Sequence, residues 1–96
     1  MKQIVWTPRS VHDLQAIRDF IEQDSSHYAE FTVQRFFSAV ERLFLFPESG
    51  RIVPEIQDPS LREVIIGSYR IVYRLIRDEI HIITIHHAAR LFKLED

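Results

Sequence analysis

The chain has 96 residues, of which 46% are hydrophobic and 11% aromatic, and its formal net charge is -2. This length predicts one small domain over residues 1–96, and the absence of cysteine excludes disulfides, thiolate nucleophiles and cysteine-based zinc sites. The acidic balance argues against a nucleic-acid binder, which usually carries a basic excess, and favours a protein-directed binder. Without a long apolar run or a secretory signal, we expect a cytoplasmic protein with no membrane association.

The N-terminal part is predicted to form a short strand followed by a helix. Lys2–Trp6 is rich in β-branched and aromatic residues, which favours a strand. Thr7 and Pro8 have the form of a helix start, with threonine as the N-cap and proline at the first helical position. Apolar residues then recur at helical spacing as far as Ile21. We therefore expect a helix over Pro8–Gln23.

A second helix is predicted after the polar break Asp24–His27, and it should run from Tyr28 to Phe46. Phe31 and Phe46 fall outside its core face, which indicates either packing at the helix ends or a contact surface for a partner. The apolar residues of the core face form a set wider than one stripe: Ala29, Val33, Phe36, Phe37, Val40, Leu43 and Phe44.

The C-terminal half is predicted to contain three antiparallel strands. Gly50–Ser60 holds two prolines and should be mostly irregular, with Ile52–Ile56 as a candidate contact loop. Strands should follow from Leu61, joined by turns at Gly67-Ser68 and Asp78-Glu79. The first turn predicts the pairs Ile66 with Tyr69, Val64 with Ile71, and Arg62 with Tyr73. The order β-α-α-β-β-β predicts an α+β fold, with a helical hairpin packed on an antiparallel sheet. The tail Leu91–Asp96 should be loosely held.

The alternation of side chains places Arg70 and Arg74 on the sheet face that points away from the helices, with Glu63 nearby. Guanidinium groups there could hold a phosphate or a carboxylate from a partner. The alternative is a solvated salt bridge with Glu63, which contributes roughly 0–1 kcal/mol.

His86 and His87 end the last predicted strand. Because neighbouring strand residues point to opposite faces, the pair cannot chelate one metal through both rings, and we predict no metal site and no cofactor. One histidine could instead act as a general acid or base. A metal-independent ribonuclease could use His87 with Arg70 and Arg90, which would supply the cations for the phosphate. The alternative is one half-buried and one solvated histidine.

An ordered set of short motifs spans nearly the whole chain: Trp6-Thr7-Pro8, Asp13-Leu14-x-x-Ile17, Pro47-x-x-Gly50-Arg51, Arg62-Glu63, Tyr69-Arg70-Ile71-Val72-Tyr73-Arg74 and His87-x-x-Arg90. This set resembles the ParE/RelE superfamily, the toxins of type II toxin–antitoxin modules, also described as plasmid-stabilisation proteins. The resemblance implies the same β-α-α-β-β-β fold. It also implies an antitoxin that wraps the toxin, usually through a segment that folds on binding.

The two branches of this superfamily imply different targets. RelE-like members cut ribosome-bound mRNA, and here Arg70 matches their strand arginine and Arg90 roughly the later one. Where they often carry a tyrosine, this chain has Phe92, which cannot transfer a proton. Lysines that would add to an RNA-binding surface are nearly absent, since Lys2 and Lys93 are the only two. ParE-like members bind DNA gyrase, and the Tyr-Arg-Ile-Val-Tyr-Arg and His-x-x-Arg motifs are closer to them.

The resemblance therefore favours a growth-arresting toxin that binds DNA gyrase and has no dedicated catalytic residues. One alternative is a ribosome-dependent endoribonuclease with His87, Arg70 and Arg90 in its site. Another is an inactive regulatory partner of the antitoxin, and a homodimer is a further expectation. The residues predicted to contact the target or antitoxin are Arg62, Arg70, Arg74, Arg90, Phe31 and Phe46.

Overall fold

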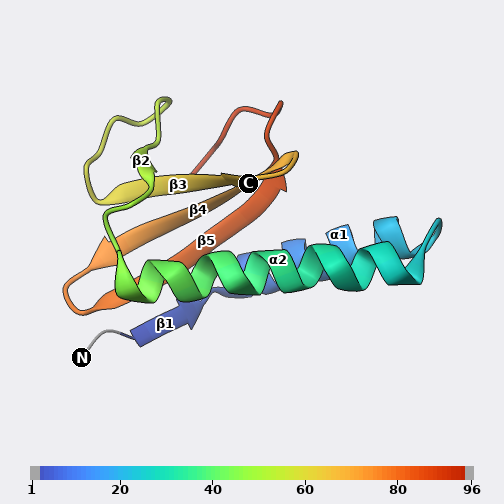
Figure 1. The fold of residues 1–96 in the computed structure, drawn as a ribbon. Coiled ribbons are helices and arrows are strands. Elements are labelled where there is room, and N and C mark those ends of the chain that lie inside the picture. Colours follow the sequence, from blue (N-terminus) through green and yellow to red (C-terminus); the bar gives the residue numbers. More distant parts are fainter. Residues whose placement is uncertain (1–2, 95–96) are drawn as a thin grey trace.

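The computed structural model describes residues 3–94, which form two helices and a five-stranded sheet (Figure 1). The elements are β1 (Gln3–Trp6), α1 (Pro8–Glu22), α2 (Ser26–Leu45), β2 (Arg51–Ile52), β3 (Leu61–Ile66), β4 (Tyr69–Ile76) and β5 (Glu79–His87). This order confirms the predicted α+β fold, and β2 adds a two-residue strand to the segment expected to be mostly irregular. Within the described residues, neither helix is long and apolar enough to cross a membrane.

Side-chain caps define where both helices begin. The Thr7 side chain accepts a hydrogen bond from the Ser10 N–H at 3.2 Å, as predicted for an N-cap. The second helix begins at Ser26, two residues earlier than predicted, because the Ser25 side chain accepts the Tyr28 N–H at 3.0 Å. Sequence periodicity located the helix, and the serine cap sets its first turn.

The strands are arranged in the order β1-β5-β4-β3-β2. The pairs β2–β3, β3–β4 and β4–β5 are antiparallel, whereas β1 lies parallel to β5. The sheet therefore differs from the expected purely antiparallel one at this edge. A parallel partner follows from the topology, because the helical hairpin returns the chain to the far side of the sheet before the meander begins.

The meander has the predicted register between β3 and β4, beginning with Ile66 opposite Tyr69. The second turn was predicted one residue too late. It consists of Arg77-Asp78, because Glu79 already pairs with Ile76.

A β-bulge interrupts β5 at Ile83, which has no residue opposite it on β4. The extra residue changes the alternation of side chains along the strand. As a result Ile82 and Ile85 both face the helices. His86 then points to the opposite face, toward Phe92, and His87 lies against Tyr69.

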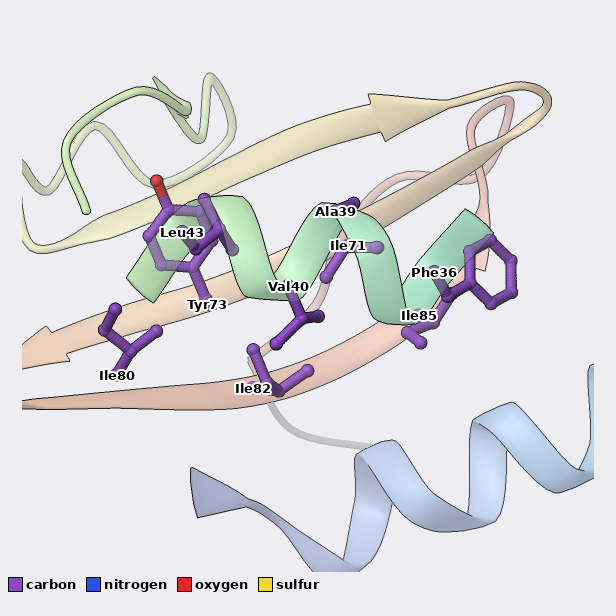
Figure 2. Close-up of a cluster of buried hydrophobic side chains, with 9 residues drawn as sticks. All are labelled: Phe36, Ala39, Val40, Leu43, Ile71, Tyr73, Ile80, Ile82 and Ile85. Carbon is purple, nitrogen blue, oxygen red and sulfur yellow. The ribbon is translucent and has the colours of Figure 1, made fainter. Parts of the chain in front are cut away.

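The inner face of the sheet packs against α2. The other helix, α1, contacts both α2 and strand β5 (Figure 1). Figure 2 shows side chains of α2 meeting those of β4 and β5 in the inner cluster: Phe36, Ala39, Val40, Leu43, Ile71, Tyr73, Ile80, Ile82 and Ile85. The prediction that Phe37 and Phe44 belong to the core is wrong, because they are 41% and 39% exposed. The apolar arc of α2 is wider than the sheet can cover.

The outer face of the sheet carries a second buried group, the outer cluster, made of Val53, Leu61, Val72 and Phe92. The expectation of a loosely held tail is wrong for Phe92, which is only 4% exposed. Arg9 also holds this segment, since its guanidinium donates to the carbonyls of Lys93 and Leu94 at 3.0 and 2.9 Å. The end of the expected tail, residues 95–96, lies outside the described part of the chain.

Tyr73 connects the inner cluster to the loop after α2. Its hydroxyl donates to the Pro47 carbonyl at 2.7 Å and accepts the Gly50 N–H at 2.9 Å. A Cβ at position 50 would lie 2.5 Å from this hydroxyl, so only glycine fits there. This contact directs the chain across the sheet edge toward the outer face.

Candidate functional site

Arg70 lies at the centre of the outer face and is only 4% exposed. Its Nε donates to Glu63 Oε1 at 2.7 Å, and its Nη1 and Nη2 donate to the two oxygens of Glu55, both at 2.8 Å. Nη1 also donates to the Arg90 carbonyl at 3.0 Å, and Nη2 makes a second contact with Glu63. Four hydrogen bonds and the ion pair with Glu63 therefore engage all three nitrogens of this guanidinium within the protein.

The charges of this ionic network are strongly coupled. The pKa of Glu55 is lowered from 4.5 to about 2, mainly by the hydrogen bonds from Arg70 and also by the Phe92 N–H, against the opposing effect of burial. Donation of the same hydrogen bonds to Glu55 raises the pKa of Arg70 above its usual value. Glu63 is fully buried and is shared between Arg70 and Arg51. The alternative of a solvated Arg70–Glu63 pair is thus replaced by a buried network with a third partner, Glu55.

Arg74 shares the outer face with Arg70 but does not meet it. The two lie four residues apart on β4, a rise of about 13 Å. Arg74 instead donates to Ser60 Oγ at 3.1 Å and lies 3.4 Å from Asp58. The N–H and hydroxyl of Ser60 lower the pKa of Asp58. The two arginines therefore hold separate acids, and they do not form one anion clamp.

Arg62 holds the loops that border the sheet. Its guanidinium donates to the carbonyls of Pro59 at 3.0 Å and Gly50 at 3.1 Å. The register places it opposite Tyr73, on the face that carries the inner cluster. Arg62 is thus separated from Arg70 by the sheet itself.

A groove of about 800 Å³ lies between α1, the end of β5 and the C-terminal segment. It collects basic and titratable side chains that are distant in sequence, and its polar lining includes Arg9, Asp13, His86, His87, Arg90 and Lys93. Across it, the Thr84 hydroxyl donates to the Asp13 carboxylate. The Arg90 side chain is exposed and makes none of the hydrogen bonds or ion pairs found within residues 3–94.

His86 is the half-buried member of the histidine pair that the sequence singled out, and His87 is the exposed one. Its ring stacks on Phe92, with centroids 6.3 Å apart, and its Nδ1 lies 2.9 Å from the His87 carbonyl. Because a carbonyl only accepts, Nδ1 carries the proton, and the buried Nε2 has no partner among the described residues. Burial lowers the pKa of His86, and the nearby Arg70, Arg90 and Arg9 lower it further. These effects favour the neutral form of the His86 ring, against the hydrogen bond to the His87 carbonyl, which favours the charged form.

His87 is exposed and lies on the other side of the strand. Its ring makes an edge contact with Tyr69, and its Nδ1 accepts the Ala89 N–H at 3.1 Å. The three residues of the predicted ribonuclease site do not all converge. His87 and Arg90 line the same groove, whereas Arg70 is buried on the outer side of the sheet. Arg90 contributes a backbone carbonyl to Arg70, not its side chain. No group of three or more metal-binding side chains occurs within the described residues.

Phe31 and Phe46 are 55% and 64% exposed, at opposite ends of α2. Their separation along the helix is about 22 Å, so they belong to different surfaces. Phe31 stacks on Tyr28 and lies beneath the Arg35 guanidinium. Phe46 lines a shallow pocket with Leu45.

An apolar groove of about 690 Å³ between α2 and β1 was not predicted as a site. Its walls include Trp6, Phe37 and Phe44, and the first two rings meet edge to face at 5.6 Å. The wide apolar arc of the second helix was the sequence signal for it. The free edge of β1 lies beside this groove, because β5 is its only partner in the described sheet.

The sequence matches the family described as the ParE toxin of type II toxin-antitoxin system, parDE, over residues 4–92. It is 41% identical over 92 residues to "Toxin RelE2" of Caulobacter vibrioides, covering 95% of this chain and 100% of that protein. The fold is similar to a chain of the chromosomal ParDE TA system from P. aeruginosa, with a TM-score of 0.75 and 24% identity. That similarity covers 91% of this chain and 96% of the other.

Proposed function

We propose that this chain, which belongs to the ParE toxin family of type II toxin–antitoxin systems, arrests growth by binding DNA gyrase and is neutralised by a cognate antitoxin. Binding is the activity that the geometry supports best, and cleavage is second. The proposed target places its action in the cytoplasm.

The engagement of Arg70 is the observation that carries this proposal. An RNA-cleaving site needs cations that are free to stabilise the charge developing on the phosphate. Here all three guanidinium nitrogens of Arg70 are already engaged, and the carboxylates of Glu55 and Glu63 lie where a phosphate would have to approach. A protein-binding toxin requires no such free cation.

Exposed aromatic and basic side chains offer the surface for protein partners. Phe31, Phe46 and Arg90 are exposed, and aromatic and arginine side chains are the residues that most often dominate binding energy at interfaces. An antitoxin segment that folds on binding would cover apolar surface of this kind.

Purified DNA gyrase provides the direct test. We expect the protein to inhibit supercoiling, and the cognate antitoxin to relieve that inhibition. Arg90→Ala and Phe46→Ser should each raise the inhibitory concentration about tenfold or more, the usual cost of losing a dominant interface residue. Phe20→Ser is the matched control, because Phe20 is 70% exposed and lines neither the pocket of Phe46 nor the groove of Arg90. Full supercoiling activity at saturating wild-type protein would refute gyrase as the target.

The groove at the end of β5 favours a second candidate, ribosome-dependent mRNA cleavage. It places His87 near Arg90 and Lys93, and a relative at 41% identity is named RelE2. If this function holds, transcripts in induced cells should be cut with codon bias, and His87→Ala should abolish the cuts. Intact transcripts during growth arrest would exclude it. Absence of any growth arrest would instead identify an inactive regulatory partner of the antitoxin.

A further inference from the structure

We propose that His86 is a pH-sensitive switch for the C-terminal segment, residues 90–94: protonation of its ring at Nε2 releases this segment from the outer face of the sheet. This device goes beyond the proposed function and does not depend on which macromolecule the toxin attacks. It is built from a histidine that the proposed function leaves unused.

The C-terminal segment is held mainly through its backbone. The Glu55 carboxylate accepts the Phe92 N–H at 2.9 Å, and Arg70 donates to the Arg90 carbonyl at 3.0 Å. Arg9 donates to the two carbonyls that follow Phe92 in the chain. Phe92 supplies the buried side chain, which packs in the outer cluster. Because residues 90–94 form neither helix nor strand, their release leaves the pairing of the strands intact.

The ring of His86 lies where this segment covers the sheet. It stacks on the Phe92 ring with an angle of 11° between the two planes. The neutral ring carries its proton on Nδ1, which donates to the His87 carbonyl, and the buried Nε2 has no partner within residues 3–94. A proton added at Nε2 would therefore create a buried, charged N–H without an acceptor, which is unfavourable. Departure of Phe92 admits water to this nitrogen.

The surroundings of His86 are predominantly basic. Charged and titratable groups face the ring or line the groove beside it from each neighbouring element: Arg9 and Asp13 on α1, Tyr69 and Arg70 on β4, His87 on β5, and Arg90 and Lys93 near the C-terminus. The nearby acids are already engaged, since Glu55 and Glu63 pair with Arg70 and Asp13 accepts the Thr84 hydroxyl. An imidazolium at this position would thus meet more positive than negative charge.

The Phe92 ring does not compensate for this repulsion. A cation over an aromatic face is attracted when it lies within about 6 Å of the ring centroid. The centroids of His86 and Phe92 are 6.3 Å apart, at the limit of that range. Burial of the ring and the three arginines therefore determine the direction of the effect, and they lower the pKa of His86.

The direction of the switch follows from the proton balance. With the segment in place, the pKa of His86 is lowered from its ordinary value of 6.5, and release returns it toward that value. The released form therefore binds more protons, so release becomes more favourable as the pH falls below about 6.5. The equilibrium constant for release should rise by up to about tenfold per pH unit, until the pH reaches the pKa of the closed form.

Hydrogen exchange of the Phe92 amide, followed by NMR on the full chain between pH 8 and 5, tests the switch. This range lies above the ordinary pKa of Glu55, so that carboxylate stays charged. The protection factor, which corrects for the intrinsic pH dependence of exchange, should be constant above about pH 7 and fall by up to about tenfold per pH unit below 6.5. The ring signals of His86 should titrate below 6.5.

The amide of Ile71, at the centre of the sheet on β4, distinguishes local release from unfolding. It should remain more strongly protected than the Phe92 amide at every pH, because release leaves the sheet folded. Equal protection of the two amides would overturn the proposal, since Phe92 would then open only when the whole domain unfolds. A His86 ring that titrates at or above 6.5 would overturn it as well.

Two variants assign the pH dependence to one ring. His86→Phe keeps a ring beside Phe92 but cannot take up a proton, so the protection of the Phe92 amide should become independent of pH. His86→Gln serves the same purpose if His86→Phe fails to fold. His87→Gln is the matched control at the next position, and it should retain the wild-type pH dependence. The proposal is overturned if the folded His86 variants keep that dependence, or if His87→Gln abolishes it.

Discussion

The two faces of the sheet are covered by different means. The inner face is covered by regular helices. The side chains of α2 and of the strands meet there in a cluster whose only polar group is the hydroxyl of Tyr73 on β4. The outer face is covered by the 53–60 loop and the C-terminal segment, which surround a buried ionic network. Apolar burial is non-directional and tolerates small shifts, whereas a buried charge requires its partners in place. The inner face therefore supplies stability, and the outer face fixes the geometry of the loops.

The largest effect should come from breaking the outer face at its centre. Arg70→Met leaves Glu55 and the fully buried Glu63 without their main counterion, and we expect a loss of about 3–5 kcal/mol in the free energy of unfolding. Urea denaturation at pH 7 measures it. Arg74→Met is the matched control on the same strand and face, and its exposed pair with Asp58 should contribute at most about 1 kcal/mol. Equal losses of unfolding free energy in the two variants would show that the buried network of Arg70 stabilises the fold no more than the exposed pair of Arg74.

The inner face should respond slightly less and through a different mechanism. Leu43→Ala removes a fully buried side chain and should cost about 2–5 kcal/mol through lost burial and the remaining cavity. This loss should not change with ionic strength or pH. Phe44→Ala, at the next helical position but partly exposed, should cost clearly less. A strong salt dependence of the Leu43→Ala effect would show that the two faces are not energetically distinct.

The smallest effect concerns the pH dependence of the outer face. The pKa of Glu55 is about 2 in the folded protein, below its usual 4.5. A lowered acid pKa stabilises the fold above the unfolded value, and this contribution disappears as the pH falls toward the folded value. The stability difference between wild type and Glu55→Gln should therefore be constant above about pH 5 and shrink between pH 4.5 and 2. A difference that stays constant down to pH 2 would contradict the Arg70–Glu55 pairing.

Local signals in the sequence were sufficient for most of the fold. Thr7 and Pro8 marked the first helix, and the Gly67-Ser68 turn alone set the correct register of β3 against β4. The parallel pairing of β1 was missed, because neither periodicity nor turn chemistry specifies which distant strand becomes the neighbour.

The candidate site was less predictable than the fold. Arg70 was placed on the correct face, but its partner Glu55 lies 15 residues away in the chain. The Phe92 N–H that also binds Glu55 lies 37 residues from that carboxylate, and both segments lack any periodic pattern. The burial of His86 depends on the bulge at Ile83, which leaves no clear trace in an apolar strand. Long-range ionic contacts and strand irregularities are thus the features that sequence reasoning did not reach.

The pairing of β1 with β5 also bears on how the chain folds as it is synthesised. The Thr7 hydroxyl donates to the carbonyl of Ile82, 75 residues later in the chain. The hydrogen bonds of β1 therefore form only after β5 has been synthesised. Contacts of such high sequence separation slow folding, since the chain entropy is lost before they form. A nascent chain that has emerged only as far as β4 lacks both this strand pair and Phe92. We therefore expect toxicity to arise only after translation has passed the C-terminal segment, which leaves time for an antitoxin to meet the new chain.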